Sequence, residues 1–157
     1  MSTIRVTKEF SFETAHALGG YDGLCRNIHG HSYRLFVTVA GTPSDRVDDP
    51  KRGMVMDFGD LKRIVNRLIV EPFDHALVMR RDDFEQRMGS YDGKLILTGW
   101  QPTCENMIAH FAEWIAAELP ANIELHHIRL NETATSYAEW YREDNSVQRL
   151  EEQGALR

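Results

Sequence analysis

Cysteine and histidine side chains gather in the segment Cys25–His31, which reads CRNIHGH. On an extended strand, positions i and i+2 face the same side, about 6.5–7 Å apart along the chain. The imidazoles of His29 and His31 can therefore converge on one ion, with Gly30 leaving the backbone between them uncrowded. An H-x-H pair alone is weak evidence for a metal, because histidines also fall near one another in loop-rich sheets.

His16 is a candidate for a third ligand. It has the same parity as Phe10 and Phe12 if the alternating strand that contains them continues to residue 16. A hairpin between this strand and one over residues 29–40 would then bring His16 to the H-x-H pair. Three neutral imidazoles with one open position are a ligand set of catalytic zinc. The sequence therefore predicts a zinc site.

Cys25 has three interpretations. It is a fourth ligand in a closed structural site, a small buried residue, or a reactive thiolate. A nearby zinc ion and a histidine would lower the pKa of the thiol and make it a usable base. Cys104, at the start of an expected helix, is also favoured as a thiolate by the helix dipole, although a partly buried small residue is the more ordinary interpretation.

Two carboxylates are further candidates. Asp74 precedes His75 in FDHAL, and a carboxylate that orients an imidazole forms a proton relay, although adjacent side chains often diverge. Glu132 ends an expected strand in RLNET, where a ligand with an N–H/NH₂ edge would satisfy a buried carboxylate. The alternative is an exposed glutamate at a strand end.

Hydrophobic periodicity predicts the elements that carry these residues. Strands alternate with period two, helices follow a 3.6-residue stripe, and Asp57 and Thr103 are expected helix N-caps. We expect strands at 4–12, 31–40, 123–132 and 136–142, one helix from Asp57 to Pro72 and another from Thr103 to Pro120. This order predicts an α+β fold, an antiparallel sheet with its helices on one face.

The remaining segments suggest one domain over residues 1–157. The connection 80–101 is charged, contains glycine, and has room for one short strand at Lys94–Leu97. The tail 143–157 is polar and could form a frayed helix. No linker or internal repeat divides the chain.

Composition narrows the function classes. The net charge of −6 argues against broad nucleic-acid binding. A small phosphorylated substrate needs only a few cations, for which the candidates are Arg26, Arg34, Lys51 and Arg52. No stretch approaches the roughly 18 apolar residues of a membrane span, and there is no apolar signal segment. With two cysteines only, we expect a cytoplasmic protein in a reducing compartment.

Six segments together resemble the 6-pyruvoyltetrahydropterin synthase / 6-carboxytetrahydropterin synthase family. In chain order they are FETAH (12–16), CRNIHGH (25–31), GMVMDFGDLK (53–62), FDHAL (73–77), PTCEN (102–106) and LNET (130–133). The resemblance implies a tunnelling fold, in which a four-stranded antiparallel sheet with two helices on one face assembles into β-barrels of trimers or hexamers. Compared with shorter members, the connection 80–101 and the tail are extended.

The resemblance also implies roles for individual residues. His16, His29 and His31 become the ligands of Zn²⁺. Cys25 becomes the catalytic base, with Asp74 and His75 as its proton relay. Glu132 becomes the anchor of the pterin ring, and Thr103 and Glu105 lie in a segment that lines the substrate pocket.

The implied substrate is 7,8-dihydroneopterin triphosphate. The compact C-x-x-x-H-G-H spacing resembles the branch that forms 6-carboxy-5,6,7,8-tetrahydropterin, with release of acetaldehyde and triphosphate, on the route to queuosine. The alternative product is that of a 6-pyruvoyltetrahydropterin synthase, which eliminates triphosphate from the same substrate. A three-histidine zinc hydrolase would leave Cys25 and Glu132 without roles, and a non-catalytic module for pterin or zinc is a further alternative.

Overall fold

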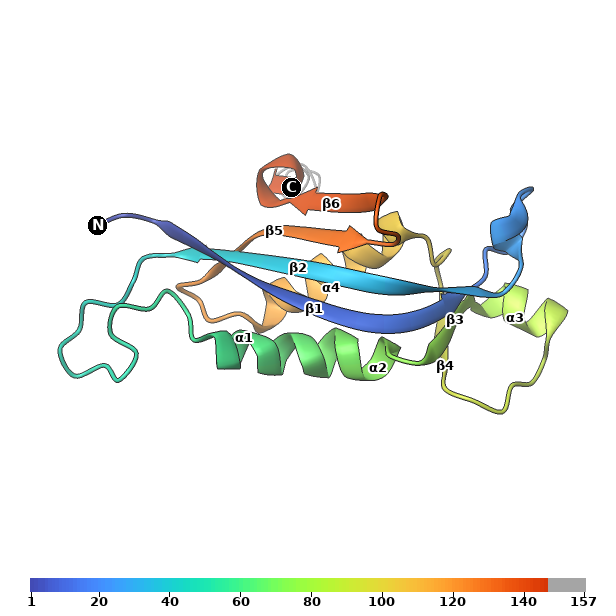
Figure 1. Ribbon diagram of the computed structural model, residues 1–157, viewed down its shortest axis with the longest axis horizontal. Helices are drawn as coiled ribbons and strands as arrows, with labels where there is room; N and C mark the ends of the chain where they lie inside the picture. Colours follow the sequence, from blue (N-terminus) through green and yellow to red (C-terminus); the bar gives the residue numbers. More distant parts are fainter. Residues whose placement is uncertain (147–157) are drawn as a thin grey trace, which may run out of the picture.

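A long antiparallel hairpin forms the centre of the molecule (Figure 1). The computed structural model describes residues 1–146. Strand β1 (Ile4–His16) pairs with β2 (His29–Gly41) along its whole length, from Ile4 opposite Gly41 to His16 opposite His29. The hairpin expected from the alternation of polar and apolar residues is confirmed, and β1 does continue to His16.

The sheet has six strands, in the order β4-β3-β1-β2-β5-β6. The four expected strands are present, but the prediction of a four-stranded, wholly antiparallel sheet was wrong. Two short strands are added beyond β1, with β3 parallel to β1 and β4 parallel to β3. The sheet is therefore mixed. The four strands outside the hairpin are β3 (Ala76–Arg80), β4 (Leu95–Thr98), β5 (Glu124–Asn131) and β6 (Tyr137–Tyr141).

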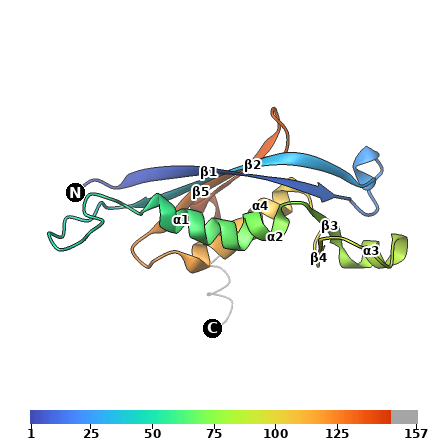
Figure 2. The ribbon, with the colours of Figure 1, turned by 60° about the horizontal axis from the view of Figure 1, so that its bottom comes forward.

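The main helices cover one face of the sheet, as expected (Figure 2). The side chains of Asp57 and Thr103 accept hydrogen bonds from backbone amides of the first turns, which confirms both N-caps. The first helix does not end at Pro72 but runs one residue further, through a π turn before the proline. Such a turn is wider than an α turn. The helical segments are α1 (Phe58–Val65), the π turn η2 (Asn66–Val70), α2 (Glu71–Phe73) and α4 (Cys104–Glu118).

The core lies between the hairpin and these helices. Phe12 of β1 stacks on Tyr33 of β2 with ring centroids 5.4 Å apart, and its edge meets Phe73 and Phe111 from the helices. All four rings are at most 2% exposed. This packing fixes the buried face of the hairpin, and His16, four residues beyond Phe12 at the end of β1, lies on that face.

The segment 80–101 is more ordered than its composition predicted. It contains helix α3 (Arg81–Arg87) as well as β4, which starts one residue after the expected Lys94. A small second cluster of buried residues packs here, formed by Ala17, Leu77, Met79 and Phe84. In the tail, residues 142–146 are helical, and the rest of the expected frayed helix, 147–157, lies outside the described residues. None of the helices in the described part combines the length and apolar character needed to cross a bilayer.

Candidate metal centre and active site

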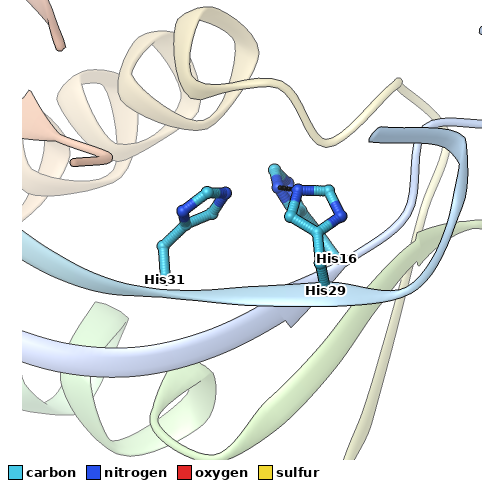
Figure 3. Close-up of side chains that lie close together, drawn as sticks. All are labelled: His16, His29 and His31. Atoms are coloured by element: carbon cyan, nitrogen blue, oxygen red, sulfur yellow. Dashed lines mark hydrogen bonds between the residues drawn. The ribbon is translucent and has the colours of Figure 1, made fainter. Parts of the chain in front are cut away.

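Three histidines meet at the end of the β1–β2 hairpin (Figure 3). His16 and His29 are direct cross-strand partners, and His31 lies two residues further along β2 on the same face. One ligand nitrogen from each ring can be chosen so that all three lie within 4.8 Å of one another. The structure thus brings together the three ligands predicted from the sequence.

Backbone carbonyls orient two of the rings. Nδ1 of His16 lies 2.7 Å from the carbonyl oxygen of Pro102, and Nδ1 of His29 lies 2.8 Å from that of Asn27. A carbonyl only accepts hydrogen bonds, so each Nδ1 carries the proton and donates it. Both Nε2 atoms are then left with an outward lone pair, which is the form that binds a metal ion.

These two lone pairs point at each other. Nε2 of His16 and Nε2 of His29 are 3.0 Å apart. With both Nδ1 positions protonated, a neutral Nε2 has no hydrogen to share, so two such lone pairs at this distance suit a cation that binds both. Tetrahedral zinc with bonds of about 2.0–2.1 Å separates its nitrogen ligands by roughly 3.3 Å. The pair is close to that separation.

His31 adds a third unsatisfied nitrogen. Its Nε2 is buried and has no hydrogen-bond partner among the described residues. It lies 3.5 Å from Oε1 of Glu132, within ion-pair distance but without hydrogen-bond geometry. Since buried polar atoms normally have a partner, an orphan at the centre of a histidine cluster indicates a missing ligand. The cluster fits a metal ion that takes three imidazoles.

Burial favours the neutral form of two of the three histidines. It lowers the pKa of His16 to about 4, with the neighbouring His29 and His31 adding to the effect. Burial also lowers the pKa of His31, against the opposing influence of Glu132. A metal ion competes with protons for the histidine nitrogens, so the lowered pKa values of His16 and His31 favour metal binding at physiological pH.

Cys25 is not part of this cluster. It is half-buried in the short 3-10 helix η1 (Leu24–Arg26), and the histidines alone make up the group of potential ligands among the described residues. Burial raises the pKa of Tyr33. Negative charges on Glu132, Cys104 and Cys25 would raise this pKa further. The two thiols and the carboxylate are therefore electrostatically coupled to the same hydroxyl.

Asp74 and His75 do form a pair, but the pair is not part of the histidine cluster. Oδ2 of Asp74 lies 2.9 Å from Nδ1 of His75, whose side chain is 78% exposed. Oδ1 of Asp74 accepts from the amide of Glu13 at 2.8 Å, and this bond holds the pKa of the carboxyl below its usual value. Among the described residues, no hydrogen bond or ion pair joins the two side chains to the histidine cluster. His75 itself has a positive φ of 60°, an uncommon conformation that often marks functional positions.

The PTCEN segment starts α4 next to the cluster. Thr103 is the N-cap, and the carbonyl of the preceding Pro102 orients His16. Cys104 is buried, its thiol donates to the carbonyl of Leu130, and burial raises its pKa to about 12. This rules out the thiolate interpretation at neutral pH. Glu105 is exposed in the first turn.

Sequence reasoning missed three contributors to the site. The carbonyls of Pro102 and Asn27 orient two histidines, and no side-chain pattern reveals a carbonyl. Tyr33 lies beneath the cluster, with its ring centroid 5.6 Å from that of His31 and its buried hydroxyl unpartnered among the described residues. A signal for Tyr33 existed, because it follows His29 and His31 at the same period of two.

Comparison with known proteins places the chain in a family. The model of the 6-pyruvoyl tetrahydropterin synthase family matches residues 5–143. A protein of Haemophilus influenzae named 6-carboxy-5,6,7,8-tetrahydropterin synthase is 35% identical over 87% of this chain and 97% of its own length. The Synechocystis protein of the same name is 36% identical over 87% and 92%.

Solved structures share the fold. An uncharacterized protein of Wolinella succinogenes aligns over 90% of this chain and 99% of its own, with a TM-score of 0.75 and 19% identity. The 6-pyruvoyl tetrahydropterin synthase of Caenorhabditis elegans aligns over 90% and 96%, with a TM-score of 0.64 and 24% identity. The match to the family model and the identity to the Haemophilus influenzae and Synechocystis proteins lead to one conclusion: this chain belongs to the 6-pyruvoyl tetrahydropterin synthase family.

Proposed function

We propose that this protein is a zinc-dependent lyase that converts 7,8-dihydroneopterin triphosphate to 6-carboxy-5,6,7,8-tetrahydropterin, with release of acetaldehyde and triphosphate. This reaction is a step in the biosynthesis of queuosine, and we place the protein in the cytoplasm. Two relatives that align over most of the chain carry the name of the product. The observation that carries the metal part of the proposal is the 3.0 Å contact between the unprotonated Nε2 atoms of His16 and His29.

The residues around the cluster suit this chemistry. Zinc, when bound, acts as a Lewis acid and template for the hydroxyls of the substrate side chain. Cys25, in the turn that leads into β2, is the base that takes a proton from that side chain. Glu132 accepts from the N–H and amino edge of the pterin ring, a contact that would replace its long approach to His31. Thr103 and Glu105 contribute the wall of the pocket at the start of α4.

We infer that the proton relay of Asp74 and His75 acts on the site of a second copy of the chain. Within one chain the pair is bonded to the backbone of β1 and exposed to solvent. We therefore assign the relay to a homo-oligomer, a trimer or hexamer, in which His75 of one copy reaches the substrate held at the cluster of its neighbour.

Paired variants of the ligand and the base test the proposal. His31→Ala should lose most of its zinc, because a two-histidine remnant binds poorly. Cys25→Ala should keep about one zinc per chain, as expected for a three-ligand site, and lose turnover. A three-histidine hydrolase, whose nucleophile is metal-bound water, would tolerate the loss of Cys25. Elemental analysis and turnover of the pterin triphosphate, measured on both variants, separate the two functions. Full zinc in His31→Ala would show the ligand assignment to be wrong.

A further inference from the structure

The loop that carries Cys25 has little apolar anchoring. It joins β1 to β2, and its 3-10 helix η1 contributes no buried side chain. Leu24 is 86% exposed and Ile28 is 51% exposed. With so little side-chain burial, the position of the thiol depends on the polar contacts of the loop backbone.

Two consecutive backbone carbonyls, those of Cys25 and Arg26, accept hydrogen bonds from other parts of the chain. The carbonyl of Cys25 accepts from the amide of Leu18 at 2.9 Å. The next carbonyl, that of Arg26, accepts from Nη1 of Arg87 at 2.6 Å. Arg87 is the last residue of α3, so the second contact joins the loop to a helix 61 positions further along the chain.

A buried carboxylate fixes the guanidinium that makes this contact. Asp83 is 7% exposed and receives both Nε and Nη2 of Arg87, at 2.8 and 2.5 Å. A bidentate pair of this kind defines the plane of the guanidinium. Because the carboxylate is buried, the pair is favourable only when both hydrogen bonds are well formed. The remaining nitrogen, Nη1, is thereby aimed at the Arg26 carbonyl.

The same carboxylate contacts the other end of the loop. A Cβ on Gly19 would lie 2.4 Å from Cγ of Asp83, so only glycine permits this approach. The carbonyl of Gly19 also accepts from the side chain of Gln101 at 2.8 Å, next to the Pro102 whose carbonyl orients His16. Both ends of the Cys25 loop are thus packed against the Asp83–Arg87 pair and the segment before α4.

We propose that Arg87, held by Asp83, is a positioning residue that sets the place of Cys25 relative to the three-histidine cluster. This inference rests on the proposed role of Cys25 as the base. Arg87 touches no reacting atom and acts through the backbone of the loop. Helix α3, which lies in the connection between β3 and β4, then contributes to the placement of the base.

The variant Arg87→Ala tests this, with Arg81→Ala as the matched control. Arg81 is an exposed arginine at the start of the same helix, and its side chain makes no hydrogen bond or ion pair with the described residues. Arg87→Ala should keep its zinc and lower kcat about ten- to a hundredfold, the cost of a displaced catalytic group, with little change in KM. Arg81→Ala should match the wild type in all three quantities.

Alkylation of Cys25 by iodoacetamide reports its position without turnover. In the wild type, zinc loading should speed alkylation at neutral pH, because a nearby dication favours the thiolate. Arg87→Ala should lose that zinc dependence. Arg87→Lys keeps the charge but not the bidentate fork and the third bond, so it should behave like the alanine variant. Peptide mass spectrometry separates Cys25 from Cys104, whose thiol is buried.

These experiments distinguish a failure of this inference from a failure of the proposed function. Unchanged kcat and unchanged zinc dependence of alkylation in Arg87→Ala would overturn the inference, as would a wild-type thiol that does not respond to zinc. Loss of zinc together with kcat would overturn it too, because Arg87 would then support the histidines. If the alanine variant does not fold, the same measurements on Arg87→Lys decide. A wild type without turnover would refute the proposed function, and the alkylation experiment would still test the position of the loop.

Discussion

At the scale of single residues, burial of His16 links the site to stability. The folded protein holds this imidazole at a pKa of about 4, whereas the unfolded chain has the ordinary value of 6.5. The unfolded state therefore binds a proton at a higher pH than the folded state does. The stabilisation is complete above pH 6.5 and is lost as the pH falls from 6.5 towards 4, by about 3 kcal/mol in total.

This predicts the behaviour of His16→Asn in the zinc-free protein. Asparagine does not titrate and can still donate to the Pro102 carbonyl, so the unfolding free energy should depend less on pH than in the wild type. Urea denaturation at several pH values between about 4 and 7 measures the two slopes. Identical slopes for the variant and the wild type would show that His16 is not the buried titrating group.

The side chains of the site were more predictable from the sequence than the contacts that orient them. Period two places His29 and His31 on one face, and the hairpin adds His16, so the cluster followed from the sequence. The orienting carbonyls of Pro102 and Asn27 did not, because any residue supplies a carbonyl. The contact of Arg87 with the Arg26 carbonyl is also invisible in sequence, since it spans 61 positions.

At the scale of elements, the strength of the hydrophobic periodicity determined which helices and strands could be predicted. The long strands β1 and β2 and the capped helices α1 and α4 follow clear stripes. Strand β3 is a five-residue run whose first four residues are all buried, and a short run without alternation carries no strand signature. Helix α3 reads RDDFEQR, and its one large apolar residue, Phe84, could not outweigh the charges.

The N-cap of α4 gives the prediction at this scale. Thr103 accepts from the amide of Asn106, and the helix starts beside the carbonyl that orients His16. Thr103→Ala should lower the unfolding free energy by about 1 kcal/mol, because one amide of the first turn loses its partner. Thr103→Ser keeps the hydroxyl and should recover most of the loss. Urea denaturation of both variants measures this, and equal losses would exclude the capping bond as the cause.

At the scale of the whole molecule, the sheet has two free edges in the described structure. β4 and β6 each pair with one neighbour only. Open edges are normally covered, paired or blunted, and pairing with further copies is one way to close a sheet into a barrel. The relay proposed above needs an annular homo-oligomer that places His75 of one copy near the cluster of the next.

Mixed oligomers test this arrangement. Cys25→Ala and His75→Ala should each be inactive alone. If the base and the relay come from different copies, subunits of the two variants mixed at random should restore about a quarter of the sites. Light scattering should give the mass of three or six chains of 18.1 kDa. Mixtures that stay inactive, although mass spectrometry shows exchanged subunits, would place the relay and the base in one chain.

The central claim is the identity of the reaction, and its most direct test is a product analysis on the zinc-loaded wild type. Incubation with 7,8-dihydroneopterin triphosphate, followed by chromatography of the pterins and a coupled assay for acetaldehyde, measures both halves of the substrate. We predict 6-carboxy-5,6,7,8-tetrahydropterin and acetaldehyde in equal amounts, with triphosphate released. Triphosphate released without acetaldehyde would contradict this and assign the protein to the pyruvoyl-forming branch, and an unchanged substrate would contradict the lyase itself.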